Sequence, residues 1–144
     1  MMKISEAMTS NVEYLTPDTT IYEAAQKMRD LDCGFLPVGD EKNEKLQGVI
    51  TDRDITIRAV AENLSPRDTR VTKILSAKVL YCYQDDDIDS AAQSMHDQQV
   101  YRLIVLNNKE DKKMVGVISL NDIVRHDQES IAGRVAKGIS RSAA

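Results

Sequence analysis

The sequence contains few of the residues on which catalytic and metal sites are commonly built. Its 144 residues include two cysteines, two histidines, no tryptophan and one phenylalanine. Cys33 and Cys82 are far apart and form no Cys-x-x-Cys pair, so the sequence predicts neither a disulfide framework nor a structural zinc site. His96 and His126 each lack a second histidine at helical ligand spacing. We therefore expect no catalytic residue, no catalytic cofactor and no enzyme activity.

Long apolar runs and an excess of positive charge are also missing. No stretch approaches the roughly 18 apolar residues of a membrane span, and the first residues lack the apolar core of a signal peptide. A net charge of -4 argues against a broad basic face for nucleic acid. We expect a cytoplasmic protein that binds neither a membrane nor nucleic acid. Its hydrophobic content of 42% suffices for one core.

What the chain does contain is a repeat. Gly48–Ile55 returns as Gly116–Ile123, and each copy is an apolar strand pattern followed by a hydroxyl-x-x-Asp sequence. The two halves align at an offset of 67 residues, which becomes 68 after the central loop. Four helix positions match at this offset: Ile21, Ala24, Ala25 and Met28 with Ile88, Ala91, Ala92 and Met95. The sustained offset indicates two duplicated half-domains.

Each half is predicted to have the order β-α-β-β-α. In the first half we expect strands at 12–15, 35–38 and 46–51, a helix from the capping box at Thr20 to Gly34, and a helix at 51–61. In the second half we expect strands at 79–83, 102–106 and 114–119 and helices at 88–99 and 120–127. Pro37 should lie where its nitrogen needs no ladder partner.

These elements predict an α/β fold of the mixed α+β type. A three-stranded sheet with helices on one face cannot bury its other surface alone, so the two halves should pack sheet to sheet about a pseudo-twofold axis. We expect one repeat over residues 1–64 and a connection over 65–70. The second repeat should cover 71–128, with a peripheral tail over 129–144.

The motifs taken together resemble a tandem pair of CBS (cystathionine β-synthase type) domains, which form a Bateman module. The resemblance covers about Ser5 to about Asp127 and includes Met8-Thr9, the two Gly-to-Asp segments and the helix–strand–strand order between them. The second half is also similar to the nucleotide-binding repeats of the AMP-activated kinase γ subunit. This resemblance implies that adenosine derivatives bind in clefts between the repeats and that occupancy becomes a conformational signal.

The hydroxyl-x-x-Asp spacing predicts helix caps at Thr51 and Ser119, with Asp54 and Asp122 at the third helical position. A cap alone would account for both pairs. Both helices, however, begin at the carboxyl end of a strand, where α/β folds bind ligands. We therefore expect the two aspartates to accept hydrogen bonds from ribose, and the two hydroxyls to contact phosphate or ribose.

Positive charge differs between the halves. Arg53 lies in a first helical turn, where the helix dipole disfavours a cation unless an anion is near, and its counterpart is Asn121. Arg102 begins a strand and matches the phosphate-contacting arginine of the kinase-subunit repeats, whereas its counterpart is Phe35. The clefts could share both arginines, or one site could dominate. We favour one dominant site, formed by Ser119, Asp122 and Arg102.

The function predicted is that of a regulatory module. We expect a homodimer that binds AMP, ADP or ATP, with AMP or ATP favoured by the arginines, and that modulates an unidentified protein partner. Three alternatives stay open: an interaction or stress-response protein with vestigial clefts, a DNA-associated regulator using the basic tail, and a pair that binds S-adenosylmethionine or metal. The acidic run at 85–87 is a weak metal candidate, because acids at a helix start also stabilise the helix dipole.

Overall fold

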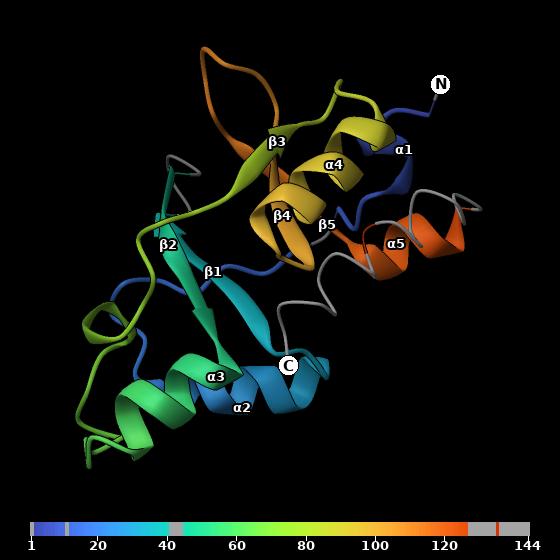
Figure 1. Ribbon diagram of the computed structural model, residues 1–144. Coiled ribbons are helices and arrows are strands. Elements are labelled where there is room, and N and C mark those ends of the chain that lie inside the picture. Colours follow the sequence, from blue (N-terminus) through green and yellow to red (C-terminus); the bar gives the residue numbers. More distant parts are fainter. Residues whose placement is uncertain (1, 11, 41–44, 127–134, 136–144) are drawn as a thin grey trace. The chain divides into compact units, whose positions relative to one another are not determined.

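The chain forms two compact units in a computed structural model that describes residues 2–10, 12–40, 45–126 and 135 (Figure 1). Unit 1 combines Met1–Val12 with Leu80–Ala144, and unit 2 is Glu13–Val79. Both units contain helices and strands, so the predicted α+β fold class is confirmed. The sheet-to-sheet packing of the halves and the residue boundaries of the repeats stay predictions.

Unit 1 contains a three-stranded sheet in the order β3-β4-β5. The strands are β3 (Tyr81–Tyr83), β4 (Arg102–Leu106) and β5 (Met114–Ser119), and the helices are α1 (Ile4–Ala7), α4 (Ile88–Gln98) and α5 (Leu120–Arg125). β3 runs parallel to β4, which is antiparallel to β5. Asp87 caps α4, and its side chain accepts the Ser90 N–H. The helix buries the predicted apolar stripe: Ile88, Ala91, Ala92 and Met95.

Unit 2 contains a two-stranded antiparallel sheet. Its strands are β1 (Phe35–Asp40) and β2 (Lys45–Thr51), and its helices are α2 (Ile21–Leu31), α3 (Asp52–Asp54), η1 (Ile55–Val60) and η2 (Val71–Lys73). η1 continues α3 as a π-helix, in which the Ala61 N–H bonds the Thr56 carbonyl. α2 ends at Asp32, which adopts a left-handed conformation with φ 52°, just before the predicted stop.

The strand predicted at 12–15 is wrong except for one residue. Leu15 forms a single parallel bridge with Val38, whereas the matching Cys82 of unit 1 lies within β3, which pairs with β4 along its whole length. In unit 1 the Ile104 N–H donates to the Leu80 carbonyl at 3.0 Å. Pro37 occupies the position of Ile104 and has no N–H to donate, so this ladder bond cannot form. The expectation for Pro37 is thereby confirmed, and the missing bond explains why the strand expected at 12–15 does not extend beyond Leu15.

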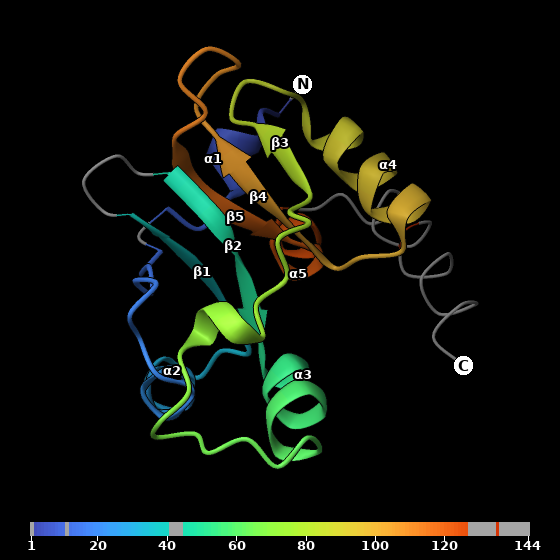
Figure 2. The ribbon, with the colours of Figure 1, turned by 90° about the vertical axis from the view of Figure 1, so that its left-hand side faces the viewer.

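The segment in front of each repeat packs on the other repeat. We name these segments leader 1 (residues 2–9) and leader 2 (residues 69–76). In leader 1 the Ile4 N–H donates to the Asp86 carbonyl at 2.9 Å. In leader 2 the Val71 N–H makes the equivalent bond to Thr19 at 2.8 Å. Figure 1 shows α1 of leader 1 beside the start of α4, which lies far along the chain from it, and Figure 2 shows the same unit from another side.

The leaders explain why both copies of the repeated motif open with glycine. Thr9 of leader 1 bridges Val117, next to Gly116, and Ser76 of leader 2 bridges Val49, next to Gly48. A Cβ on Gly116 would lie 2.6 Å from the Thr9 carbonyl oxygen, and one on Gly48 would lie 2.4 Å from the Ser76 carbonyl oxygen. Neither glycine has a positive φ. Close approach of the leader backbone therefore requires glycine here.

Each unit has its own apolar core, to which its leader contributes. Ile4 and Ala7 are buried with Ile88 and Ile118 in unit 1, and Val71 and Ile74 are buried with Ile21 and Ile50 in unit 2. Of the predicted tail, only Val135 lies within the described residues, and it is buried in the unit 1 core. Helices in the described part of the chain are all too short or too polar to span a bilayer.

Candidate functional site

Both predicted hydroxyl-x-x-Asp pairs form reciprocal caps. In unit 2, Thr51 Oγ1 accepts the Asp54 N–H at 3.0 Å, and Asp54 Oδ2 accepts the Thr51 N–H at 3.0 Å. In unit 1, Ser119 Oγ accepts the Asp122 N–H at 3.1 Å, and Asp122 Oδ2 accepts the Ser119 N–H at 2.9 Å. Each hydroxyl keeps its own hydrogen for donation, and each carboxylate keeps Oδ1 for another partner.

Burial differs between the two aspartates. The Asp122 side chain is 4% exposed, and Asp122 is the one charged residue that is buried among the described residues. The Asp54 side chain is 17% exposed. An ionised carboxylate in such surroundings needs paired charge or hydrogen bonds, because burial without them is costly. The partners of the two Oδ1 atoms therefore decide what each aspartate can do.

In unit 1 the structure brings three predicted site residues to one end of the sheet. Arg102 begins β4 directly opposite Ser119 in the antiparallel register with β5, and Asp122 follows in the first turn of α5. The Leu120 N–H donates to the Tyr101 carbonyl at 2.8 Å, which ties the start of α5 to the start of β4. The exposed Arg102 thus lies opposite Ser119, whose hydroxyl caps the helix that carries Asp122.

Unit 2 has the same framework without that arginine. Phe35 lies opposite Thr51 at the place of Arg102, and the Asp52 N–H bonds the Gly34 carbonyl at 3.0 Å. Arg53 lies in the first turn of α3, as predicted, and is exposed. Its backbone N–H donates to Asp52 Oδ1 at 2.8 Å. Arg53 and Arg102 belong to different units, so each unit holds one of the two predicted cations.

Two further arginines contact the aspartates: Arg58, which the sequence alone suggests is a surface residue, and Arg125. Arg125 donates from Nη2 to Asp122 Oδ1, and Arg58 Nε lies 3.9 Å from Asp54 Oδ1. Arg58 also donates from Nη1 to the Ile74 carbonyl at 3.1 Å and to that of Leu75 at 3.4 Å. In the sequence, Arg125 stands three residues after Asp122 and Arg58 stands four residues after Asp54. On a helix this spacing places two side chains next to each other, so it could have indicated both contacts.

The acidic run at 85–87 has separate structural roles. Asp87 caps α4, Asp86 Oδ2 accepts the Tyr83 N–H at 3.0 Å, and Asp85 lies 3.8 Å from Lys3 Nζ. Nowhere in residues 2–10, 12–40, 45–126 or 135 do three or more His, Cys, Asp or Glu side chains gather as metal ligands. Burial raises the pKa of Cys82 from 9.0 to about 12, with a smaller effect from Asp86, so this thiol stays protonated at neutral pH.

Comparison with known proteins identifies relatives of similar length. The family model described as "CBS domain" matches residues 4–60 and 71–129. The YlbB protein of Bacillus subtilis is 34% identical over 128 residues, which is 89% of this chain and 84% of that protein. Hypoxic response protein 1 of Mycobacterium tuberculosis is 30% identical over 140 residues, which is 96% of this chain and 94% of that protein.

Solved structures share the fold. Hypoxic Response Protein I, crystallised with two coordinated zinc ions, superposes with a TM-score of 0.75 at 29% identity and covers 88% of this chain and 99% of its own. The CBS domain pair of protein MJ0100, in complex with 5′-methylthioadenosine and S-adenosyl-L-methionine, superposes with a TM-score of 0.75 at 23% identity. That match covers 90% of this chain and 98% of the other, and it shows the fold alone.

Proposed function

Because this chain belongs to the CBS domain family, with both of its repeats matched by the family model, we propose that it is a non-catalytic regulatory protein that binds an adenine nucleotide, AMP, ADP or ATP. The observation that carries the proposal is the grouping of Arg102, Ser119 and Asp122 at one end of the unit 1 sheet. A cation, a hydroxyl donor and a carboxylate are the groups that a nucleoside phosphate requires.

The roles follow from the charges. A carboxylate repels phosphate but accepts hydrogen bonds from a sugar diol, so Asp54 and Asp122 are assigned to ribose. Thr51 and Ser119 can donate their hydroxyl hydrogens to phosphate or ribose. Arg53 and Arg102 supply positive charge for phosphate, and guanidinium suits this because it offers several donors in one plane.

Zinc and S-adenosylmethionine also belong in the test, because similar proteins bind them. Zinc is bound in Hypoxic Response Protein I, and S-adenosylmethionine and 5′-methylthioadenosine are bound in MJ0100. Both adenosine derivatives lack phosphate, and the sulfonium of S-adenosylmethionine favours an acid beside it, whereas Arg53 and Arg102 favour phosphate. We rank the adenine nucleotides first for that reason.

Occupancy would act by population shift, since a ligand stabilises whichever conformation binds it better. We propose a homodimer in the cytoplasm that passes this change to a separate protein partner. An interaction protein without a functional ligand site is the second candidate, and the same binding measurement separates the two.

The test is isothermal titration calorimetry with AMP, ADP, ATP, S-adenosylmethionine and zinc chloride on the wild-type protein and on Asp54→Asn and Asp122→Asn. Asparagine keeps an oxygen that can accept the capping N–H, so these changes remove charge with little effect on the cap. Losing one charged hydrogen-bond acceptor should weaken nucleotide binding about tenfold at the affected site.

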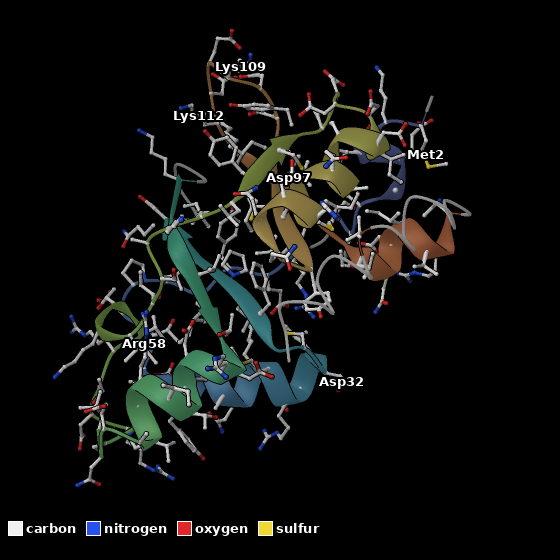
Figure 3. The ribbon with its side chains drawn as sticks, in the orientation of Figure 1. Met2, Asp32, Arg58, Asp97, Lys109 and Lys112 are labelled. Atoms are coloured by element: carbon white, nitrogen blue, oxygen red, sulfur yellow. The ribbon has the colours of Figure 1, made fainter. Side chains whose placement is uncertain are left out.

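The matched control is Asp97→Asn on α4, an exposed acid labelled in Figure 3. Its variant should bind nucleotide as the wild type does. Absence of binding to every adenosine ligand at millimolar concentration would refute the proposed function and leave the interaction protein. Binding of zinc without nucleotide would replace the proposed ligand.

A further inference from the structure

The two matched aspartates differ in what their outer oxygen contacts. Asp122 Oδ1 accepts a hydrogen bond from Arg125 Nη2. Asp54 Oδ1 lies 3.9 Å from Arg58 Nε, which is beyond hydrogen-bonding distance. In both units Oδ2 is held by the backbone N–H of the capping residue. Oδ1 is therefore the oxygen left for a ligand, and only in unit 1 is it already hydrogen-bonded to a guanidinium.

The difference begins in the sequence of the two helices. Arg125 stands three residues after Asp122, and Arg58 stands four residues after Asp54. At the repeat offset, the counterpart of Arg125 is Ile57 and that of Arg58 is His126. A shift of one residue turns a side chain by about 100° around a helix. The two arginines thus leave their helices in different directions.

In unit 2 the Arg58 guanidinium lies within ion-pair distance of Asp54, but its hydrogen bonds go to leader 2. Arg58 Nη1 donates to the main-chain carbonyls of Ile74 and Leu75, at 3.1 Å and 3.4 Å. Figure 3 labels Arg58, which lies beside the segment that follows η2. The guanidinium of Arg58 is therefore bound by neutral carbonyls, whereas that of Arg125 is bound by the aspartate itself.

We infer that Arg125 determines which of the two aspartates takes a ribose: it occupies the Asp122 oxygen that the sugar diol needs, so Asp54 binds the diol first. Asp122 binds it less tightly while Arg125 holds that oxygen, because the two donors must then share the lone pairs of Oδ1. This inference rests on the proposed function. It reverses the order expected from the sequence, in which Ser119, Asp122 and Arg102 formed the dominant site.

The strength of this competition is limited by the exposure of the arginine. The Arg125 side chain is 70% exposed, so water solvates its guanidinium once it leaves, while the 4% exposed Asp122 exchanges one set of donors for another. Exposed ion pairs are weak, and a charge-assisted hydrogen bond to a buried carboxylate is stronger. We expect Arg125 to weaken diol binding at Asp122 by about threefold to tenfold.

The experiment measures each site alone. In an Asp54→Asn background, which leaves Asp122 as the one ribose carboxylate, AMP binding is titrated with Arg125 intact and with Arg125→Gln and Arg125→Met. Methionine retains the apolar stem without a donor, and glutamine keeps a neutral donor. The expected result is AMP affinity about threefold to tenfold higher for Arg125→Met, with Arg125→Gln in between.

Two controls isolate the diol and the arginine. AMP is replaced by 2′,3′-dideoxy-AMP, which has no diol, and its affinity should not change when Arg125 is substituted. In an Asp122→Asn background, Arg58→Met should change AMP affinity by less than about twofold, because Arg58 does not hydrogen-bond Asp54. Circular dichroism establishes folding, and if Arg125→Met unfolds, Arg125→Gln decides the outcome.

Weaker AMP binding after loss of Arg125 would overturn the inference and make Arg125 a phosphate ligand. Unchanged AMP affinity would also overturn it. Either result would leave the proposed function standing, because AMP still binds. If neither the wild type nor any variant binds AMP, ADP or ATP, the proposed function is refuted, and this inference is refuted with it.

Discussion

Replacing Gly116 by alanine should destabilise the protein through leader 1. The new Cβ would lie 2.6 Å from the Thr9 carbonyl oxygen and 2.8 Å from Met8 Sδ. To relieve this contact the leader must move away and lose its two hydrogen bonds with Val117, which measure 2.9 Å and 3.0 Å. Two backbone bonds at about 1 kcal/mol each, less about 0.4–1 kcal/mol that alanine gains over glycine in the unfolded chain, leave a loss of about 1–2 kcal/mol.

The assay is urea unfolding followed by far-UV circular dichroism. The matched control is Gly34→Ala, whose Cβ would meet Asp52 Oδ2 at 2.6 Å, at the end of an exposed side chain that can rotate. Gly34 also lacks a positive φ, so this control should stay within about 0.5 kcal/mol of wild type. Equal stability of Gly116→Ala, Gly34→Ala and wild type would refute the packing of leader 1 against β5.

Three further predictions concern Cys82 and Asp87 of unit 1. Burial raises the pKa of Cys82 to about 12, so at pH 8 a thiol reagent should modify the half-buried Cys33 quickly and Cys82 only after unfolding. The unfolded Cys82 thiol ionises near pH 9, whereas the native thiol stays protonated up to about pH 12. The stability that protonated Cys82 contributes is therefore present below pH 9 and is lost between pH 9 and 12. A free energy of unfolding that rises over that range would contradict this prediction. Asp87→Ala removes the cap on Ser90 and should cost about 1 kcal/mol in thermal unfolding, whereas the exposed Asp85→Ala should cost far less; equal losses would count against the cap.

Most local elements were predictable because their signals are local. The strands β4 and β5 match the expected ranges, 102–106 and 114–119, residue for residue. Both hydroxyl-x-x-Asp caps form as expected, since a cap needs only residues three apart. The strand expected at 12–15 does not form beyond Leu15, because Pro37 lacks the N–H that would bond a neighbour distant in the sequence.

The site was predictable in part. The spacing located the two aspartates and hydroxyls, and the register of β4 with β5 then brought Arg102 opposite Ser119. Whether these residues bind nucleotide stays a prediction. Arg58 and Arg125 could not be told apart from ordinary surface cations, because a residue's partner depends on rotamer and on the main chain that lies across from it.

The sequence by itself determined the repeat, the helix caps and the element order, since each arises from neighbours within a few residues and from side-chain periodicity. Only the tertiary structure decided that each leader packs on the other repeat, that Gly48 and Gly116 are required by a crossing backbone, and that Arg125 binds its aspartate while Arg58 is held by leader 2. These contacts join segments far apart in the chain, and such contacts leave no periodic pattern in the sequence.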